Sequence, residues 1–214
     1  MYEIIQRVAA SHTDAEGRMK FVSAMDMIQD CSQLWMESEP AIERYFREQG
    51  IVQVLVSRQA DVIRLPRYGE RLSVRTSVYE CQSFIGYRNT AIYDEAGLPC
   101  VKSWSTGAFV VTATGKPAKL PVDRLGLLTL DTKLEMDYQS KKIRLPEEAG
   151  EDLPPARVRR NDIDFNRHVN NARYVELAME YLEGDFAVSR FRAEYKRPAI
   201  YGDTFYPRII RAGR

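Results

Sequence analysis

One amphipathic segment near the start of the chain precedes four long segments that are rich in β-branched and aromatic residues. Apolar residues recur at helical spacing over residues 24–36, and Ser23 with Asp26 predicts a capping pair at the start of this helix. Turn-forming residues separate the later segments, which predict strands at 51–65, 71–81, 84–93 and 100–113. One helix followed by a meander of long antiparallel strands is typical of an α+β fold in which the sheet wraps the helix.

The second half of the chain repeats the first with divergence. An alignment that places Asp14 on Asp162 also pairs Glu16 with Asp164, Arg18 with Asn166 and Lys20 with His168. A later turn repeats at a smaller offset, from Tyr68 to Tyr201, which predicts an insertion over 37–49 in the first half. The similarity is low, so a chance match remains the alternative to internal duplication.

This duplication predicts a first half over 1–122, an irregular connector over 123–154 and a second half over 155–214. After the second helix we expect only two strands, at 187–196 and 204–211, where a complete repeat would have two more. Either the sequence is truncated or another chain completes the sheet, because the missing strands would leave an open edge.

The composition argues against several classes of function. There are 31 basic and 30 acidic residues, so nothing favours nucleic acid or an anionic membrane as the main partner. Cys31, Cys81 and Cys100 are widely spaced without a CxxC pair, which predicts reduced thiols and neither disulfides nor a zinc site. No run approaches the roughly 20 apolar residues of a membrane span, and residues 1–8 do not predict a signal peptide, since they lack a charged leader followed by a long apolar run. We expect a cytoplasmic protein without a metal or cofactor.

Residues 161–184 hold the most informative motif, a dense polar run directly before an amphipathic helix for which Gly184 is the expected stop. The polar residues of the run are Asp162, Asp164, Asn166, His168, Asn170 and Asn171. A carboxylate, an amide and an imidazole that converge on a helix start can polarise a carbonyl and activate water. The imidazole titrates near neutral pH, and the free N–H groups of a first helical turn can stabilise an oxyanion.

The same residue types also form turns and helix caps. We interpret Asp162, Asn170 and Asn171 in this way. For His168, its spacing from Asp164 and Asn166 on the approach to a helix favours a functional role.

The order Asp164-x-Asn166-x-His168-Val169-Asn170-Asn171 resembles the active-site segment of the acyl-ACP thioesterases. Ser103-Trp104 leading into residues 114–121 is similar to the end of that family's first hotdog domain, so the likeness covers essentially the whole chain. The resemblance implies a tandem hotdog fold, in which each half is a long antiparallel sheet wrapped on a central helix. It also implies hydrolysis of an acyl thioester on acyl carrier protein (ACP) to free fatty acid and holo-ACP.

The resemblance further implies roles for individual residues. Asn166 would bind the carbonyl oxygen or the attacking water, His168 would act as general base or acid, and Asp164 would orient them or help to activate water. The first half has Arg18 and Lys20 at the paired positions and is expected to be catalytically silent and to shape the acyl pocket. Candidate pocket residues on its helix are Met27, Ile28, Cys31 and Trp35, with plain core packing as the alternative.

Because ACP is acidic as a class, a basic docking surface is expected near the motif. Arg160, Arg167 and Arg173 are the candidates, and a solvated basic face is the alternative interpretation. A homodimer remains open.

One departure from the family pattern affects the mechanism. Plant members carry a Glu-Cys pair after a Glu-Tyr-basic-basic run, whereas here Glu194-Tyr195-Lys196-Arg197 is followed by Pro198-Ala199. We therefore expect direct attack by water and no covalent acyl-enzyme. The departure also keeps two rivals open, an acyl-CoA thioesterase on the same fold and a non-catalytic acyl-binding hotdog protein. A dehydratase is disfavoured, because no matching His-centred dehydratase segment is present.

Overall fold

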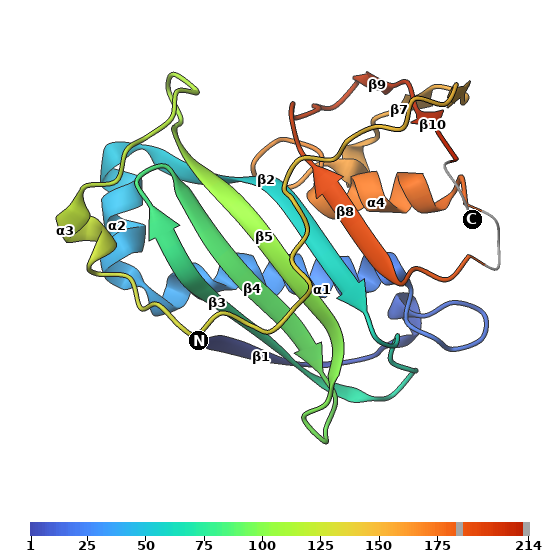
Figure 1. Ribbon diagram of the computed structural model, residues 1–214, viewed down its shortest axis with the longest axis horizontal. Helices are drawn as coiled ribbons and strands as arrows, with labels where there is room; N and C mark the ends of the chain where they lie inside the picture. Colours follow the sequence, from blue (N-terminus) through green and yellow to red (C-terminus); the bar gives the residue numbers. More distant parts are fainter. Residues whose placement is uncertain (183–185, 212–214) are drawn as a thin grey trace. The chain divides into compact units, whose positions relative to one another are not determined.

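The computed structural model describes residues 1–182 and 186–211, which form two compact units (Figure 1). Unit 1 comprises residues 1–141 and 187–194, and unit 2 comprises the described residues of 142–186 and 195–214. No helix in this described part of the chain is long and apolar enough to cross a lipid bilayer.

Unit 1 is a six-stranded antiparallel sheet with a long helix against one face. The helix is α1 (Phe21–Leu34), whose side chains from Ala24 to Cys31 include some of the most buried in the protein. The strands, in sheet order, are β1 (Tyr2–Arg7), β3 (Arg71–Gln82), β4 (Ile85–Tyr93), β5 (Pro99–Val111), β2 (Ile51–Val62) and β8 (Arg190–Glu194). All four strands predicted from the first half are confirmed within a few residues.

The start of α1 differs from the prediction. The helix begins at Phe21, its N-cap Lys20 makes no side-chain capping bond, and Ser23 lies inside the helix, so the predicted Ser23–Asp26 cap is wrong. Packing explains the earlier start, because the Phe21 ring is buried against Phe191 of β8 with ring centroids 5.5 Å apart. A tertiary contact of this kind outweighs a weak local cap.

The predicted insertion after the first helix is a helix of its own. After a short 3₁₀ turn, α2 (Pro40–Gln49) begins with proline and ends at Gly50, whose φ of 60° is the left-handed value of a helix C-cap. Ile42 and Phe46 of α2 pack on Ile51 and Phe109 of the sheet in a second apolar cluster.

Equivalent hydrogen bonds confirm the internal duplication and correct its alignment. The bonds Asp14 N–Arg18 O and Gly17 N–Asp14 O recur as Asp164 N–His168 O and Arg167 N–Asp164 O, all 2.8–3.1 Å long. Asp14 is therefore equivalent to Asp164, and the predicted alignment of Asp14 with Asp162 is wrong. The shared aspartate at positions 14 and 162 was misleading, because Asp162 is at the repeat position equivalent to His12.

The later part of the predicted alignment is confirmed. The bonds Val8 N–Glu70 O and Val158 N–Asp203 O are equivalent in the corrected alignment, and Glu70 and Asp203 each lie two residues after the paired tyrosines Tyr68 and Tyr201. The two halves therefore differ by an insertion between the first helix and this turn.

Unit 2 contains a shorter version of the same arrangement. Its helix α4 (Asn171–Met179) follows the 3₁₀ turn η3 (Arg160–Asp162). The strand expected at 204–211 is broken at Pro207, and its two parts pair with strands from before η3. These short strands are β6 (Glu151–Asp152) with β10 (Arg208–Ile209), and β7 (Ala156–Arg157) with β9 (Thr204–Phe205). The expected helix stop, Gly184, lies outside the described residues, and α4 ends before it.

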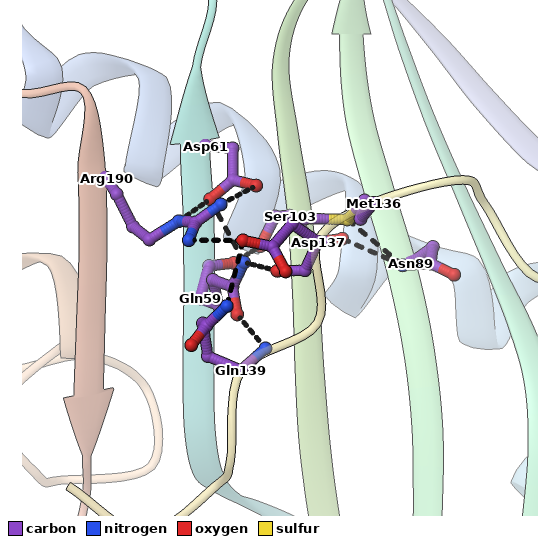
Figure 2. A network of polar contacts seen from close by, with 8 residues as sticks. All are labelled: Gln59, Asp61, Asn89, Ser103, Met136, Asp137, Gln139 and Arg190. Carbon is purple, nitrogen blue, oxygen red and sulfur yellow. Dashed lines mark hydrogen bonds and ion pairs between the residues drawn. The ribbon is translucent and has the colours of Figure 1, made fainter.

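The expected connector is partly a strap that lies on the sheet of unit 1. After a short helix, α3 (Val122–Leu125), residues 131–141 cross the face opposite α1 (Figure 1). Two buried amides hold this strap to the sheet (Figure 2). Gln59 donates to the carbonyl of Asp137 (2.8 Å) and accepts from Gln139 N (2.9 Å), while Asn89 Oδ1 accepts from Leu134 N (3.0 Å).

Ion pairs join strand β8 to both the sheet and the strap. Arg190 forms ion pairs with Asp61 of β2 (2.7 Å) and Asp137 of the strap (2.8 Å), as Figure 2 shows. In the β2–β8 ladder, Gln59 pairs with Arg192. These two residues are equivalent positions of the repeat when Tyr68 is aligned with Tyr201. At this point of the ladder, a residue of the first repeat therefore pairs with the equivalent residue of the second repeat.

Candidate functional site

The three predicted catalytic residues lie on one tight turn of unit 2, between η3 and α4. Asp164 organises this turn, since its carboxylate accepts a hydrogen bond from the main-chain N–H of Asn166 (2.8 Å). Its own N–H donates to the carbonyl of His168 (2.9 Å), and an isolated bridge between Ile163 and Val169 closes the turn. The chain therefore folds back within five residues and presents the side chains of 165–168 outward.

The side chains of Asn166 and His168 are exposed, whereas Asp164 is half-buried. Among residues 1–182 and 186–211, neither the Asn166 amide nor the His168 imidazole takes part in a hydrogen bond. The structure thus brings the carboxylate, the amide and the imidazole onto one turn without bonding them to one another, and it leaves the last two available to a ligand.

The polar neighbours predicted to have local structural roles behave in two ways. Asn170 is the N-cap of α4 and accepts a hydrogen bond from Ala172 N (2.8 Å), and Asp162 accepts from Arg159 N (2.7 Å). Both interpretations are confirmed. Asn171 is instead the first residue of the helix, and its N–H has no acceptor within the described residues.

The equivalent turn of unit 1 shows what this turn lacks. There, Arg18 takes the place of His168 and closes an ion pair with Asp14 (3.3 Å), and Glu16 takes the place of Asn166. The corrected alignment thus gives unit 1 neither an imidazole nor an amide at these positions. In unit 2 the substitution of histidine for arginine leaves the second carboxylate oxygen of Asp164 without such a partner in the described chain.

Sequence reasoning missed the backbone strain at Arg167. Its φ of 64° makes it the one residue other than glycine with a positive φ in the described chain, while the equivalent Gly17 has a φ of 72°. A bulky residue in this region costs energy and is often found at functional sites. The signal was available in the sequence, because the alignment of Asp14 with Asp164 pairs a turn glycine with an arginine.

The residues that replace the plant Glu-Cys pair lie beside this turn. The carbonyl of Ala199 accepts from Val169 N (2.8 Å), and Ala199 N donates to the Tyr174 hydroxyl (3.1 Å). Tyr174 is held between Tyr195 and Phe205, with ring centroids 6.1 and 5.3 Å away. Pro198 and Ala199 thus offer neither a carboxylate nor a thiol at this position.

Arginine side chains gather around an open polar hollow next to η3 and α4, with a volume of about 410 Å³. The residues that line it are Arg159, Arg160, Asn161, Asp162, Arg173 and Glu176. Carboxylates position two of the arginines: Asp162 binds Arg159 (2.9 Å) and Glu176 binds Arg173 (2.7 Å). Arg160 lies over the Tyr201 ring, 5.6 Å from its centroid. Of the predicted docking residues, Arg160 and Arg173 share this hollow, and Arg167 is on the neighbouring turn.

The predicted acyl-pocket residues belong to unit 1, where Met27, Ile28, Cys31 and Trp35 are all buried. Cys31 donates to the carbonyl of Val74 (3.3 Å), and burial raises the pKa of its thiol to about 11. Trp35 lines a cavity that lies between α2 and the sheet. In the described part of the chain, no group of three or more His, Cys, Asp or Glu side chains could hold a metal ion.

Comparison with known proteins agrees with this architecture. The family model described as the acyl-ACP thioesterase N-terminal domain matches residues 2–125, and the acyl-ACP thioesterase C-terminal domain matches residues 147–206. No curated protein sequence matches the chain significantly.

Solved structures show the same fold at low sequence identity. An acyl-ACP thioesterase from Bacteroides thetaiotaomicron is 21% identical with a TM-score of 0.82, and the match covers 95% of this chain and 84% of that one. The 12:0-ACP thioesterase from Umbellularia californica is 17% identical with a TM-score of 0.81 and the same two coverages. A 1,4-dihydroxy-2-naphthoyl-CoA thioesterase from Synechocystis, 17% identical with a TM-score of 0.50, matches 58% of this chain and 92% of its own.

The duplicated helix-and-sheet arrangement is thus a tandem hotdog fold. Because the N-terminal family model alone matches more than half of its residues, the chain belongs to the acyl-ACP thioesterase family, whose members are thioester hydrolases.

Proposed function

We propose that the turn from Asp164 to His168 carries out the hydrolysis of the fatty acyl thioester on ACP. The observation that carries this proposal is the contrast between two equivalent turns, because an Asn–His pair without hydrogen-bonding partners in the described chain replaces a Glu and an ion-paired Arg. The overall reaction produces free fatty acid and holo-ACP.

In the proposed mechanism, the His168 imidazole takes a proton from water as the water oxygen attacks the thioester carbonyl carbon. The Asn166 amide and the N–H of Asn171 donate to the oxyanion, and the start of α4 at Asn171 favours negative charge. When the C–S bond breaks, the imidazolium returns its proton to the departing thiolate of ACP. Asp164 fixes the turn through its bond to Asn166 N, and so positions both side chains.

The proposal does not use a cysteine nucleophile. Ala199 stands where the plant enzymes have their thiol, and Cys31, Cys81 and Cys100 all belong to unit 1. No covalent acyl-enzyme is therefore expected, and trapping one by mass spectrometry during turnover would contradict direct attack by water.

The same proposal assigns the arginine hollow and Arg167 to docking of the acidic carrier protein. Arg159 and Arg173 are held in place by carboxylates, which lowers the entropy lost when they bind an anion. Charge on such a surface increases the association rate and makes it depend on salt. A cytoplasmic location is also part of this proposal, and it is supported by three free cysteines, which suit a reducing compartment.

The decisive experiment measures hydrolysis across a panel of acyl-ACP and acyl-CoA thioesters. Asn166→Ala and His168→Ala are each expected to lose roughly 10²–10³-fold in kcat, since each removes a group that acts in the transition state. Both side chains are exposed, so the variants should remain folded, which circular dichroism verifies.

Glu16→Ala and Arg18→Ala provide matched controls, because they alter the same two positions of the equivalent turn in unit 1. They are expected to retain most of the activity. A folded wild type that binds acyl chains but cleaves no ester would instead identify a non-catalytic acyl-binding protein. A preference for CoA esters over ACP esters would identify an acyl-CoA thioesterase.

A further inference from the structure

Two glycines face each other in the middle of the unit 1 sheet. Gly86 of β4 and Gly107 of β5 are direct partners in the ladder, and both are buried. Neither has a positive φ, so the backbone itself does not require glycine at either position. Glycine inside a strand weakens the strand and often marks a place where another group approaches closely. The pair therefore provides space on one face of the sheet.

The side chain of Gln53 occupies that space. A Cβ atom at Gly107 would lie 2.6 Å from Gln53 Nε2 and 2.8 Å from its Cδ, and a Cβ at Gly86 would lie 3.1 Å from the same nitrogen. Gln53 is an exposed residue overall, and its amide forms no hydrogen bond with any other described residue. The side chain is therefore placed by shape alone and can leave the glycine pair without breaking a polar contact.

Gln53 also lines the cavity beside the glycines. The other lining residues are Trp35, Ile42, Phe46, Val78, Cys81, Gly86, Phe109 and Leu128, none of which is charged. The cavity volume is about 10 Å³, barely the space for a single water-sized group. The cavity is thus a small apolar pocket that is almost filled while Gln53 lies on the glycines.

The walls of this small pocket differ in rigidity. The Trp35 ring is fixed by the guanidinium of Arg88, which lies 4.2 Å from the ring centroid and is itself buried. Phe46 and Phe109 pack edge to face with ring centroids 5.5 Å apart. Only the Gln53 wall is both exposed to solvent and free of directional contacts in the described chain.

We propose that Gln53, resting on Gly86 and Gly107, determines the length of acyl chain that the enzyme accepts. The inference depends on the proposed function, since it assigns the cavity to the methyl end of the substrate's acyl chain. With Gln53 on the glycines the pocket ends at Trp35 and Phe109. When Gln53 turns toward solvent, the space above the two glycines admits additional methylene groups.

The test compares acyl-ACP substrates of graded chain length for the wild type and Gln53→Ala. The variant is expected to prefer an acyl chain about two carbons longer than the wild type does. The ratio of kcat/KM for this longer substrate to kcat/KM for the substrate that the wild type prefers should rise roughly tenfold. In Gln53→Ala/Gly107→Ala the added methyl group refills the space, so the preference should return toward that of the wild type.

Two single variants separate the effect of the volume of the Gln53 side chain from effects of its amide group and of substitution in β2. Gln53→Met keeps the length of the side chain without its amide and is expected to retain the wild-type profile. Val54→Ala alters the next residue of β2, which points to the opposite face of the sheet, and should change nothing. An unchanged chain-length profile in folded, active Gln53→Ala would overturn the inference and leave the proposed function intact.

Binding of free fatty acids of graded length, measured by displacement of a fluorescent fatty acid, decides the same question without catalysis. Gln53→Ala is expected to favour longer fatty acids, and equal length preference in both proteins would count against the inference. A wild type that hydrolyses no thioester would refute the proposed function alone, because the binding series still reports on the cavity.

Discussion

Individual residues give the two turns of the repeat different properties. At the same position of each turn, Gly17 and Arg167 adopt nearly the same left-handed backbone, with φ of 72° and 64°. Only glycine adopts this conformation without a steric penalty, which is roughly 1–2 kcal/mol for other residues. The turn that we propose to be catalytic therefore keeps a strained arginine where the equivalent turn of unit 1 has an unstrained glycine.

Replacing Arg167 with glycine should stabilise the protein by about 0.5–1 kcal/mol, because relief of the strain exceeds the added entropy of the unfolded chain. Urea unfolding measures the change. The reciprocal variant Gly17→Arg should destabilise the protein by about 1–2 kcal/mol. If Arg167→Gly is no more stable than the wild type, the strain at this residue is compensated by contacts that the substitution removes.

The thiols provide a second test at the residue scale. Burial raises the pKa of Cys31 and of Cys81 to about 11 and also raises that of Cys100. Because the thiolate is the reactive form, native alkylation by iodoacetamide should be slow at pH 8 and accelerate as the pH approaches 11. Intact mass and thioester hydrolysis are measured together. Rapid alkylation of these thiols at pH 8 in the folded protein would contradict the prediction.

At the scale of elements, the strap over residues 131–141 shows how an irregular segment is held on a sheet. It contains no helix or strand, yet Gln59 and Asn89, which are 2% and 4% exposed, satisfy its main-chain groups from the sheet (Figure 2). Buried main-chain groups need such partners, because an unpaired one costs about 1–3 kcal/mol. The two amides therefore replace the ladder that a regular strand would have provided.

Replacing Asn89 with leucine should destabilise the protein by about 2 kcal/mol, since it leaves the N–H of Leu134 without its acceptor and removes one of the two acceptors of the Tyr138 hydroxyl. Urea unfolding measures the loss, and trypsin should cleave faster at Lys133 and Lys141 within the strap. Gln139→Ala is the matched control, because among the described residues that side chain bonds only Asp137, at the surface. Equal stability of both variants would show that the Asn89 amide does not stabilise the strap.

At the scale of the whole molecule, the duplication explains the pairing of short segments that local patterns did not identify. Strands β6 and β7 are the broken equivalent of β1, and β9 and β10 are the broken equivalent of the start of β3. The pairs Arg7–Arg71 and Arg157–Thr204 occupy the same place in the two ladders. Prolines interrupt the second version, so the sequence predicted β9 and β10 as one strand over 204–211 and did not predict β6 and β7, which are only two residues long each.

The sequence by itself determined the elements whose burial is periodic and the turn whose polar residues are unusual. Four long strands, the first helix and the carboxylate–amide–imidazole motif follow from residue spacing, because burial on one face is recorded at every second or fourth residue. The insertion after the first helix also followed, from the difference between two repeat offsets. Each of these features depends on residues that are close in the chain.

Only the tertiary structure decided what depends on contacts between distant residues. The start of α1 at Phe21 reflects packing on Phe191, and the repeat alignment that pairs Gly17 with Arg167 is visible in hydrogen bonds and hidden in residue identity. The place of Gln53 over Gly86 and Gly107 likewise joins three strands. A one-dimensional pattern records whether a residue is buried, whereas the partner that buries it is fixed by strand register and by the packing of separate elements.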